Sequence, residues 1–148
     1  GAVLLTRFMA LSGVPDFVAE TISRNAVSSI TLIIGASVVY LILGCFLEPI
    51  SIMLLTLPIL IPALQKLDVN LVWFGILVVK LLEIGLITPP VGLNVFAAKA
   101  LVGDRISLES IFAGVGWFLV CEVLVLSLLV AYPEISLFLP RAMGLMKF

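Results

Sequence analysis

Long apolar runs, separated by short stretches rich in polar residues, glycine or proline, dominate the pattern of this 148-residue chain. Such runs are typical of helices in a membrane, where the backbone must satisfy its own hydrogen bonds. The pattern predicts five elements in chain order. They are the end of a membrane helix over residues 1–12, an amphipathic interfacial helix over 15–26, a helical hairpin over 28–66, an interrupted membrane helix over 71–101 and a membrane helix over 109–132.

The hairpin is predicted from the lengths of two apolar runs. The runs 30–44 and 50–64 have about 15 residues each, whereas a full membrane span needs about 20. We expect Gly44 to stop the first arm and Pro49 to occupy the first turn of the second. The pair then forms a re-entrant hairpin whose tip lies near the middle of the membrane. The alternative is one long bent helix or two tilted spans.

Three residues in or directly before the second arm affect its start and its length. Glu48 precedes the arm, and an ionisable group at membrane depth is a functional hypothesis by default. Capping of the helix start by Glu48 is an equally weighted alternative. Pro58 and Pro62 are expected to interrupt the arm and to keep it short or kinked.

The centre of the 71–101 segment, residues 84–94, reads IGLITPPVGLN. Pro89 and Pro90 cannot donate backbone hydrogen bonds, and each disfavours helical geometry in the residue before it. Gly92 permits backbone angles that other residues resist. We therefore expect the helix to unwind after about residue 87 and to restart near Leu93. A simple proline kink is the alternative.

Such an interruption is costly in lipid and is tolerated where protein or water covers it. The first half-helix would present carbonyl oxygens, which suit Na⁺. The second half-helix would present N–H groups, which suit an anion. The interruption therefore favours a binding site over a purely structural role.

Polar and aromatic side chains within the apolar segments carry further expectations. Trp73 and Phe74 are predicted to anchor their helix at the membrane interface. Lys80 and Glu83 are three residues apart, so they share a helix face and form a charge pair that holds this helix against a neighbour or contacts substrate. Glu122 must face the protein interior, where a packing contact is favoured over a ligand role.

The last predicted helix has its own start and packing signals. Ser107, with Glu109 and Ser110, is expected to open it. Gly114 and Gly116 are expected to allow close helix packing. Pro133 is expected to end it, with Pro140, Arg141 and Lys147 in a surface tail.

Composition narrows the class of protein. The chain is 63% hydrophobic and 11% charged, whereas a soluble domain is about a quarter charged. The net charge of −1 offers no basic face to nucleic acid. The absence of histidine excludes His metal sites and His acid–base catalysis. Cys45 and Cys121 both lie in apolar runs. No nucleophile–base pair or metal-ligand spacing is present, so we expect neither an enzyme nor a cofactor.

The chain starts within an apolar run and without methionine, which suggests the C-terminal part of a longer protein. The order of elements is specific, and four segments carry a family resemblance. They are Gly44-Cys45-Phe46-Leu47-Glu48-Pro49, Leu57-Pro58-Ile59-Leu60-Ile61-Pro62, Trp73-Phe74-Gly75 and Glu83-Ile84-Gly85-Leu86-Ile87-Thr88-Pro89-Pro90-Val91-Gly92-Leu93-Asn94. Over nearly its whole length the chain resembles the C-terminal repeat of the large membrane subunit of TRAP (tripartite ATP-independent periplasmic) transporters.

This resemblance implies sodium-coupled import of an organic acid, such as a C4-dicarboxylate or sialic acid, across the bacterial inner membrane. It also implies a periplasmic substrate-binding protein, a small membrane subunit and an N-terminal repeat of the same large subunit as partners. The implied fold is an all-α membrane protein, half of an inverted-repeat elevator-type transporter with a re-entrant hairpin and a discontinuous transmembrane helix. Na⁺ is the coupling ion, and no cofactor is implied.

The resemblance also implies site residues. Sodium partners lie at the hairpin tip and at the helix break: Gly44, Cys45, Thr88, Pro90, Val91 and Gly92. Candidate substrate contacts lie at the two helix starts that face this site: Glu48, Pro49, Leu93 and Asn94. The competing interpretations are a channel or passive permease subunit without ion coupling, a membrane enzyme, and a purely structural subunit.

Overall fold

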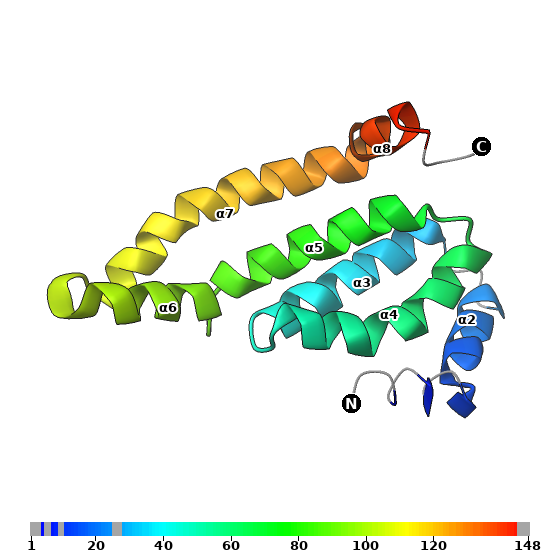
Figure 1. Cartoon of the computed structure of the whole chain (residues 1–148), viewed down its shortest axis with the longest axis horizontal. Coiled ribbons are helices and arrows are strands. Elements are labelled where there is room, and N and C mark those ends of the chain that lie inside the picture. Colours follow the sequence, from blue (N-terminus) through cyan, green and yellow to red (C-terminus); the bar gives the residue numbers. More distant parts are fainter. Residues whose placement is uncertain (1–3, 5–6, 9–10, 25–27, 145–148) are drawn as a thin grey trace.

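The computed structural model describes residues 4, 7–8, 11–24 and 28–144 (Figure 1). Every regular element in these residues is helical, so the predicted all-α fold class is confirmed. The elements are α2 (Val14–Arg24), α3 (Ser29–Gly44), α4 (Pro49–Lys66), α5 (Leu71–Ile87), α6 (Leu93–Val102), the 3-10 helix η1 (Gly103–Arg105), α7 (Leu108–Ala131) and α8 (Pro133–Ala142). Most of the helix end predicted over 1–12 lies outside the described residues, as do residues 25 and 26 of the predicted interfacial helix and Lys147.

The helices form an elongated bundle (Figure 1). Helices α3 and α4 are joined by a short turn and run back along each other as a hairpin. Helix α5 packs on α3, α6 continues beyond the end of α5, and α7 returns along both. The short helix α2 packs on α4 at the end of the bundle far from α6. The turn between α3 and α4 therefore lies at the same level as the junction of α5 and α6.

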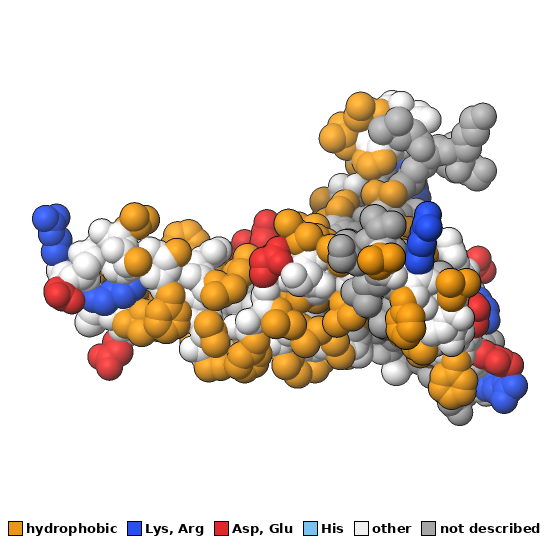
Figure 2. Space-filling view, turned by 60° about the horizontal axis from the view of Figure 1, so that its bottom comes forward, with side chains coloured by type: hydrophobic (Ala, Val, Ile, Leu, Met, Phe, Trp, Pro, Cys, Tyr) orange, Lys and Arg blue, Asp and Glu red, His pale blue; other side chains and the backbone are white. Residues whose placement is uncertain are grey.

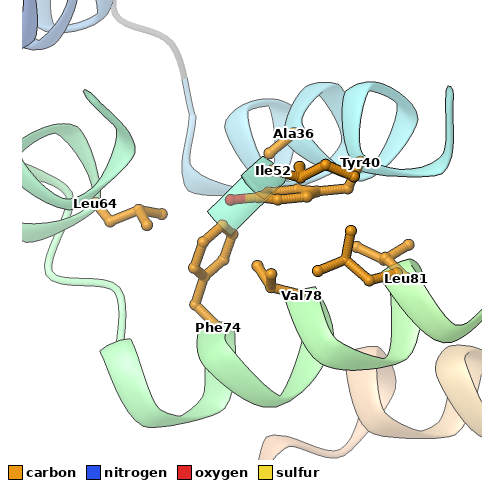
Figure 3. Packing of buried hydrophobic residues seen from close by; sticks show 8 residues of the cluster. Ala36, Tyr40, Ile52, Leu64, Phe74, Val78 and Leu81 are labelled. Atoms are coloured by element: carbon orange, nitrogen blue, oxygen red, sulfur yellow. The ribbon is translucent and has the colours of Figure 1, made fainter. Parts of the chain in front are cut away.

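The core lies between α3, α4 and α5 (Figure 3). Tyr40 is fully buried there, and its ring meets that of Phe74 edge to face at 6.5 Å. The hydroxyl of Thr56 donates to the carbonyl of Ile52 at 2.8 Å, so the Tyr40 hydroxyl, 2.6 Å away, donates to Thr56. The one polar atom of this buried ring is thus satisfied, as burial of a tyrosine requires.

The interface anchors predicted at Trp73 and Phe74 are wrong. Both side chains are buried between helices, and the indole Nε1 of Trp73 donates to the carbonyl of Leu129 in α7 at 2.9 Å. The reason is helical spacing, because these residues share the face of α5 that carries the buried Leu77, Val78 and Leu81. They hold α5 to its neighbours instead of facing lipid head groups.

Of the effects predicted for Pro58 and Pro62, an interrupted and shortened second arm is wrong, because α4 runs through both over 18 residues. Each proline removes only its own backbone donor, and the remaining bonds and the packing of α2 along α4 keep the helix continuous. Helix α4 is consequently long and apolar enough to cross a membrane, as is α7. The re-entrant depth of the hairpin stays a prediction.

The other ends of the helices follow local signals. Ser28, Asn70 and Ser107 accept hydrogen bonds from backbone N–H groups in the first turns of α3, α5 and α7. This confirms the predicted start at Ser107. Pro133 follows the end of α7, as expected, but it also opens α8, which was not predicted.

Many large apolar side chains are exposed. Figure 2 shows hydrophobic side chains along the length of the visible face, with charged side chains near the two ends of the bundle and acidic side chains near its middle. No residue of α7 is buried, and Trp117 and Phe118 are among its most exposed side chains. Gly114 and Gly116 meet no atom within 4 Å of an added Cβ, so the close packing predicted for them is not present between the described residues.

Candidate ion and substrate site

The predicted interruption of the long apolar segment is confirmed. Helix α5 ends at Ile87, and α6 begins at Leu93. Thr88 has extended backbone angles of φ −87° and ψ 134°, and Gly92 has a positive φ of 60°. A simple kink is excluded because residues 88–92 lie outside both helices.

The prolines determine how the carbonyls at the end of α5 are satisfied. Position 89 cannot donate to the carbonyl of Gly85, which instead accepts from the backbone N–H of Thr88 at 3.1 Å. Pro90 likewise cannot donate to the carbonyl of Leu86. The Thr88 hydroxyl donates to the carbonyl of Ile84 at 2.6 Å. Its single proton is thereby used inside the helix, and the lone pairs of its oxygen are left to accept or to coordinate.

Two glycines bring the hairpin tip against the helix that precedes the break. A Cβ added to Gly85 would lie 2.7 Å from both Cα and the carbonyl carbon of Gly44, and 3.1 Å from the Gly44 oxygen. Conversely, a Cβ on Gly44 would lie 3.2 Å from Cα of Gly85. The two backbones are in direct contact, which only glycine permits. The hairpin tip thus lies against the last turn of α5, next to the break, as the family resemblance implies.

The predicted end of α3 at Gly44 is confirmed, and the contact with Gly85 gives the residue a second role. Helix α3 does end there, but the residue has no positive φ, and Cys45 after it is still right-handed. Gly44 is required for close approach and not for a left-handed stop. Gly85 was missed by the sequence analysis. The signal in the sequence was a glycine within a predicted helix. Glycine there costs about 1 kcal/mol of stability relative to alanine, so its presence indicates close packing.

Cys45 and Glu48 flank the turn of the hairpin. The Cys45 side chain is buried, and its thiol donates to the carbonyl of Leu41 at 3.2 Å. Glu48 is exposed and caps α4. One carboxylate oxygen accepts from the N–H of Ile50 at 2.9 Å, and the other accepts from the N–H and hydroxyl of Ser51 at 3.2 and 2.7 Å.

Glu48 was considered as a functional group at membrane depth or as a helix cap, and in the structure it is a helix cap. Its carboxylate occupies the N-terminus of α4, with Pro49 at the first helical position. The start of α6 differs, because its N-cap is Gly92, which has no side chain to accept from the first turn. Leu93 and Asn94 at that start are exposed. Pro90 is exposed and Val91 half-buried in the connecting turn.

The break also contacts α7. A Cβ on Gly92 would lie 3.2 Å from the ring of Phe112 and 3.4 Å from the carbonyl oxygen of Thr88. Together with its positive φ, this makes glycine the favoured residue at position 92. One side of the turn thus packs on α7, and Pro89 and Pro90 are exposed on the other.

Before the break, α5 carries a charged cluster. The Lys80 ammonium lies 2.8 Å from Glu83, which confirms the predicted pair, and 2.7 Å from Glu122 of α7. The cluster therefore links two helices. The second partner was not predicted, because spacing along one helix does not report which residue of another helix lies opposite.

These features define an all-helical protein with apolar membrane-type helices, in which a helical hairpin packs on a discontinuous helix. The chain belongs to the family of the DctM component of tripartite ATP-independent periplasmic transporters, whose model matches residues 1–135. It is 34% identical over 97% of its length to the C4-dicarboxylate TRAP transporter large permease protein DctM of Pseudomonas aeruginosa, of which it covers 33%. The corresponding protein of Rhodobacter capsulatus is 33% identical over 97% of the chain, which covers 32% of it.

A third relative is the sialic acid TRAP transporter permease protein SiaT of Haemophilus influenzae. It is 32% identical over 84% of the chain, which covers 20% of that protein. The chain thus spans a third or less of the length of these curated relatives. These three relatives are named as transporter permeases.

Proposed function

We propose that this chain forms half of the transport core of a sodium-coupled importer of organic acids in the bacterial inner membrane. The transported acid is a C4-dicarboxylate, sialic acid or a similar carboxylate, as the names of the relatives suggest. The N-terminal repeat of the same large subunit, a small membrane subunit and a periplasmic substrate-binding protein complete the system. In this proposal, the chain is the C-terminal repeat of an elevator-type carrier.

One observation carries the proposal. The contact between Gly44 and Gly85 holds the hairpin tip against the last turn of α5, next to the break. This closeness supports a cation site that draws carbonyl oxygens from both segments. Hard cations take oxygen ligands, and Na⁺ in discontinuous helices is held by unwound carbonyls and helix C-terminal ends. The tip contributes Gly44 and the carbonyl of Cys45. The break contributes the Thr88 hydroxyl and residues Pro90, Val91 and Gly92.

The substrate carboxylate binds at the start of α6 in this proposal. Glu48 already neutralises the start of α4, which leaves Glu48 and Pro49 as the rim of the site and not as its anion-binding end. The first turn of α6 at Leu93 and Asn94 has no side-chain cap, and a helix start favours negative charge. The site thus holds a cation on one side of the break and an anion on the other.

Uptake measured against sodium concentration tests the cation site. In the complete transporter in proteoliposomes, Thr88→Ala removes one oxygen ligand, and we expect the sodium concentration for half-maximal uptake to rise about tenfold, the equivalent of 1.4 kcal/mol. Gly92→Leu forces a side chain into a backbone conformation with positive φ, and we expect it to raise the same sodium concentration. Ser127→Ala is the matched control, because its hydroxyl makes the same kind of bond four residues back, at 2.7 Å, on exposed α7.

Two results would contradict the proposal. Unaltered sodium activation in both variants at normal expression removes the cation site from these residues. Uptake that persists in the wild type after collapse of the sodium gradient favours the channel or passive permease.

Asn94→Asp tests the anion side separately. A carboxylate in the first turn favours the helix itself, but it repels a substrate carboxylate. We expect the KM for the organic acid to rise several-fold while thermal stability is kept or improved. An unchanged KM would place the substrate elsewhere.

A further inference from the structure

We propose that one face of α5 is the docking surface for a membrane helix that carries an arginine or lysine, supplied by a part of the large subunit that this chain does not span. This Glu83 face consists of Val72, Ile76, Val79 and Glu83. The proposal rests on the membrane location of the bundle and not on the transported substrate or the coupling ion.

Charge is the first argument. Lys80 is shared by Glu83 and Glu122, so two carboxylates have one ammonium between them, and within the described residues one negative charge is uncompensated. The Lys80 and Glu122 side chains are 22% and 28% exposed, whereas that of Glu83 is 54% exposed. The uncompensated charge therefore points away from the bundle. A carboxylate within an apolar membrane segment is costly unless a cation faces it.

The shape of the surface is the second argument. Residues 72, 76, 79 and 83 are spaced by four, three and four positions, so they follow one face of α5. A groove of about 440 Å³ lies on this face between α5 and Met53 of α4, and Val72, Ile76, Val79 and Lys80 are part of its lining. Glu83 lies one turn beyond Val79 on the same face of the helix. Val72 and Val79 on its wall are 44% and 47% exposed. An apolar stripe that ends in a carboxylate fits an apolar helix that ends in a basic side chain.

The length of the relatives indicates the source of this helix. The chain covers 33% of the Pseudomonas aeruginosa relative, so about two thirds of such a subunit lies outside the structure. Lipid tails would fill the groove equally well, but they bring no cation to Glu83. An apolar helix of the same subunit would fill the groove, and its basic side chain would compensate the charge of Glu83.

Photo-crosslinking in the complete transporter tests the docking surface without altering the charged cluster. A photoreactive benzoylphenylalanine replaces Val79, and Leu124, 65% exposed on α7, is the matched control position. We expect the Val79 position to crosslink to a peptide of the large subunit from outside this chain, in an apolar helix with an Arg or Lys, and the Leu124 position not to reach this peptide. Crosslinks confined to lipid, to the small membrane subunit or to the binding protein would overturn the proposal.

Charge reversal then tests the pair itself. Glu83→Lys places an ammonium group beside Lys80 and opposite the proposed basic partner, so it should reduce the yield of intact detergent-purified transporter by more than about tenfold. Glu109→Lys, at an exposed acidic residue in the first turn of α7, is the control and should leave the yield unchanged. Replacement of the crosslinked basic residue by Glu should restore the Glu83→Lys variant. Failure of this reversal to restore the yield would show that Glu83 has a different partner.

Discussion

The substitution Gly85→Ala tests whether backbone contact holds the hairpin tip to the helix break. The new Cβ would lie 2.7 Å from two backbone carbons of Gly44. Non-bonded carbons rest at about 3.5 Å or more, so the helices must separate by roughly 0.8 Å. Neither obstacle is a side chain that can rotate away. We therefore take the upper end of the overpacking cost, a loss of stability of about 3 kcal/mol. The higher helix propensity of alanine offsets about 1 kcal/mol of this loss.

The same displacement should weaken sodium binding. Coordination distances tolerate about 0.2 Å, so a separation of roughly 0.8 Å between the two groups of proposed ligands exceeds the tolerance severalfold. We expect the sodium concentration for half-maximal uptake to rise by at least about tenfold, together with a lower melting temperature. Uptake in proteoliposomes and thermal melting of the purified transporter measure the two effects.

Gly35→Ala is the matched control for this prediction. Gly35 lies in the interior of α3, and an added Cβ would meet no atom within 4 Å. Alanine there should raise stability by up to about 1 kcal/mol and leave sodium activation unchanged. The two variants should thus differ by about 3 kcal/mol in stability, with opposite signs. Identical melting and identical sodium dependence of the two would refute the backbone contact as the element that joins tip and break.

Two further predictions concern capping and the core. Glu48→Ala should lower stability by about 1 kcal/mol through loss of the α4 cap, whereas Glu48→Gln keeps a capping oxygen and should retain uptake. Abolished uptake in Glu48→Gln at unchanged melting temperature would instead assign the carboxylate to the transport site. Leu81→Ala, at a residue 1% exposed, should cost about 2–5 kcal/mol, and Leu124→Ala less than about 0.5 kcal/mol. Thermal melting measures both, and equal losses would contradict the assigned core.

The sequence predicted those parts of the fold that depend on covalent chemistry or on spacing within one helix. Pro89 and Pro90 lack donors whatever surrounds them, so the break after Ile87 follows from the sequence alone. The Lys80–Glu83 pair follows from helical geometry. Glu48 before Pro49 was recognised as a possible cap, and it is one.

The parts that depend on contacts between helices were not predictable in this way. Gly85 was missed because nothing in its own helix shows that Gly44 packs against it. Trp73 was assigned to the membrane interface from its residue type, whereas the position of α7 decides that it is buried. Gly114 was expected to pack closely, but it meets no described neighbour. Residue type states what a side chain can do, and the fold decides which partner it meets.

The bare-backbone contact of Gly44 and Gly85 has a mechanical consequence. A side-chain contact yields by rotation about its χ angles, but a backbone contact yields only when a whole helix moves. The hairpin tip can therefore leave α5 only when a whole helix shifts, because no side chain between them can rotate to make room.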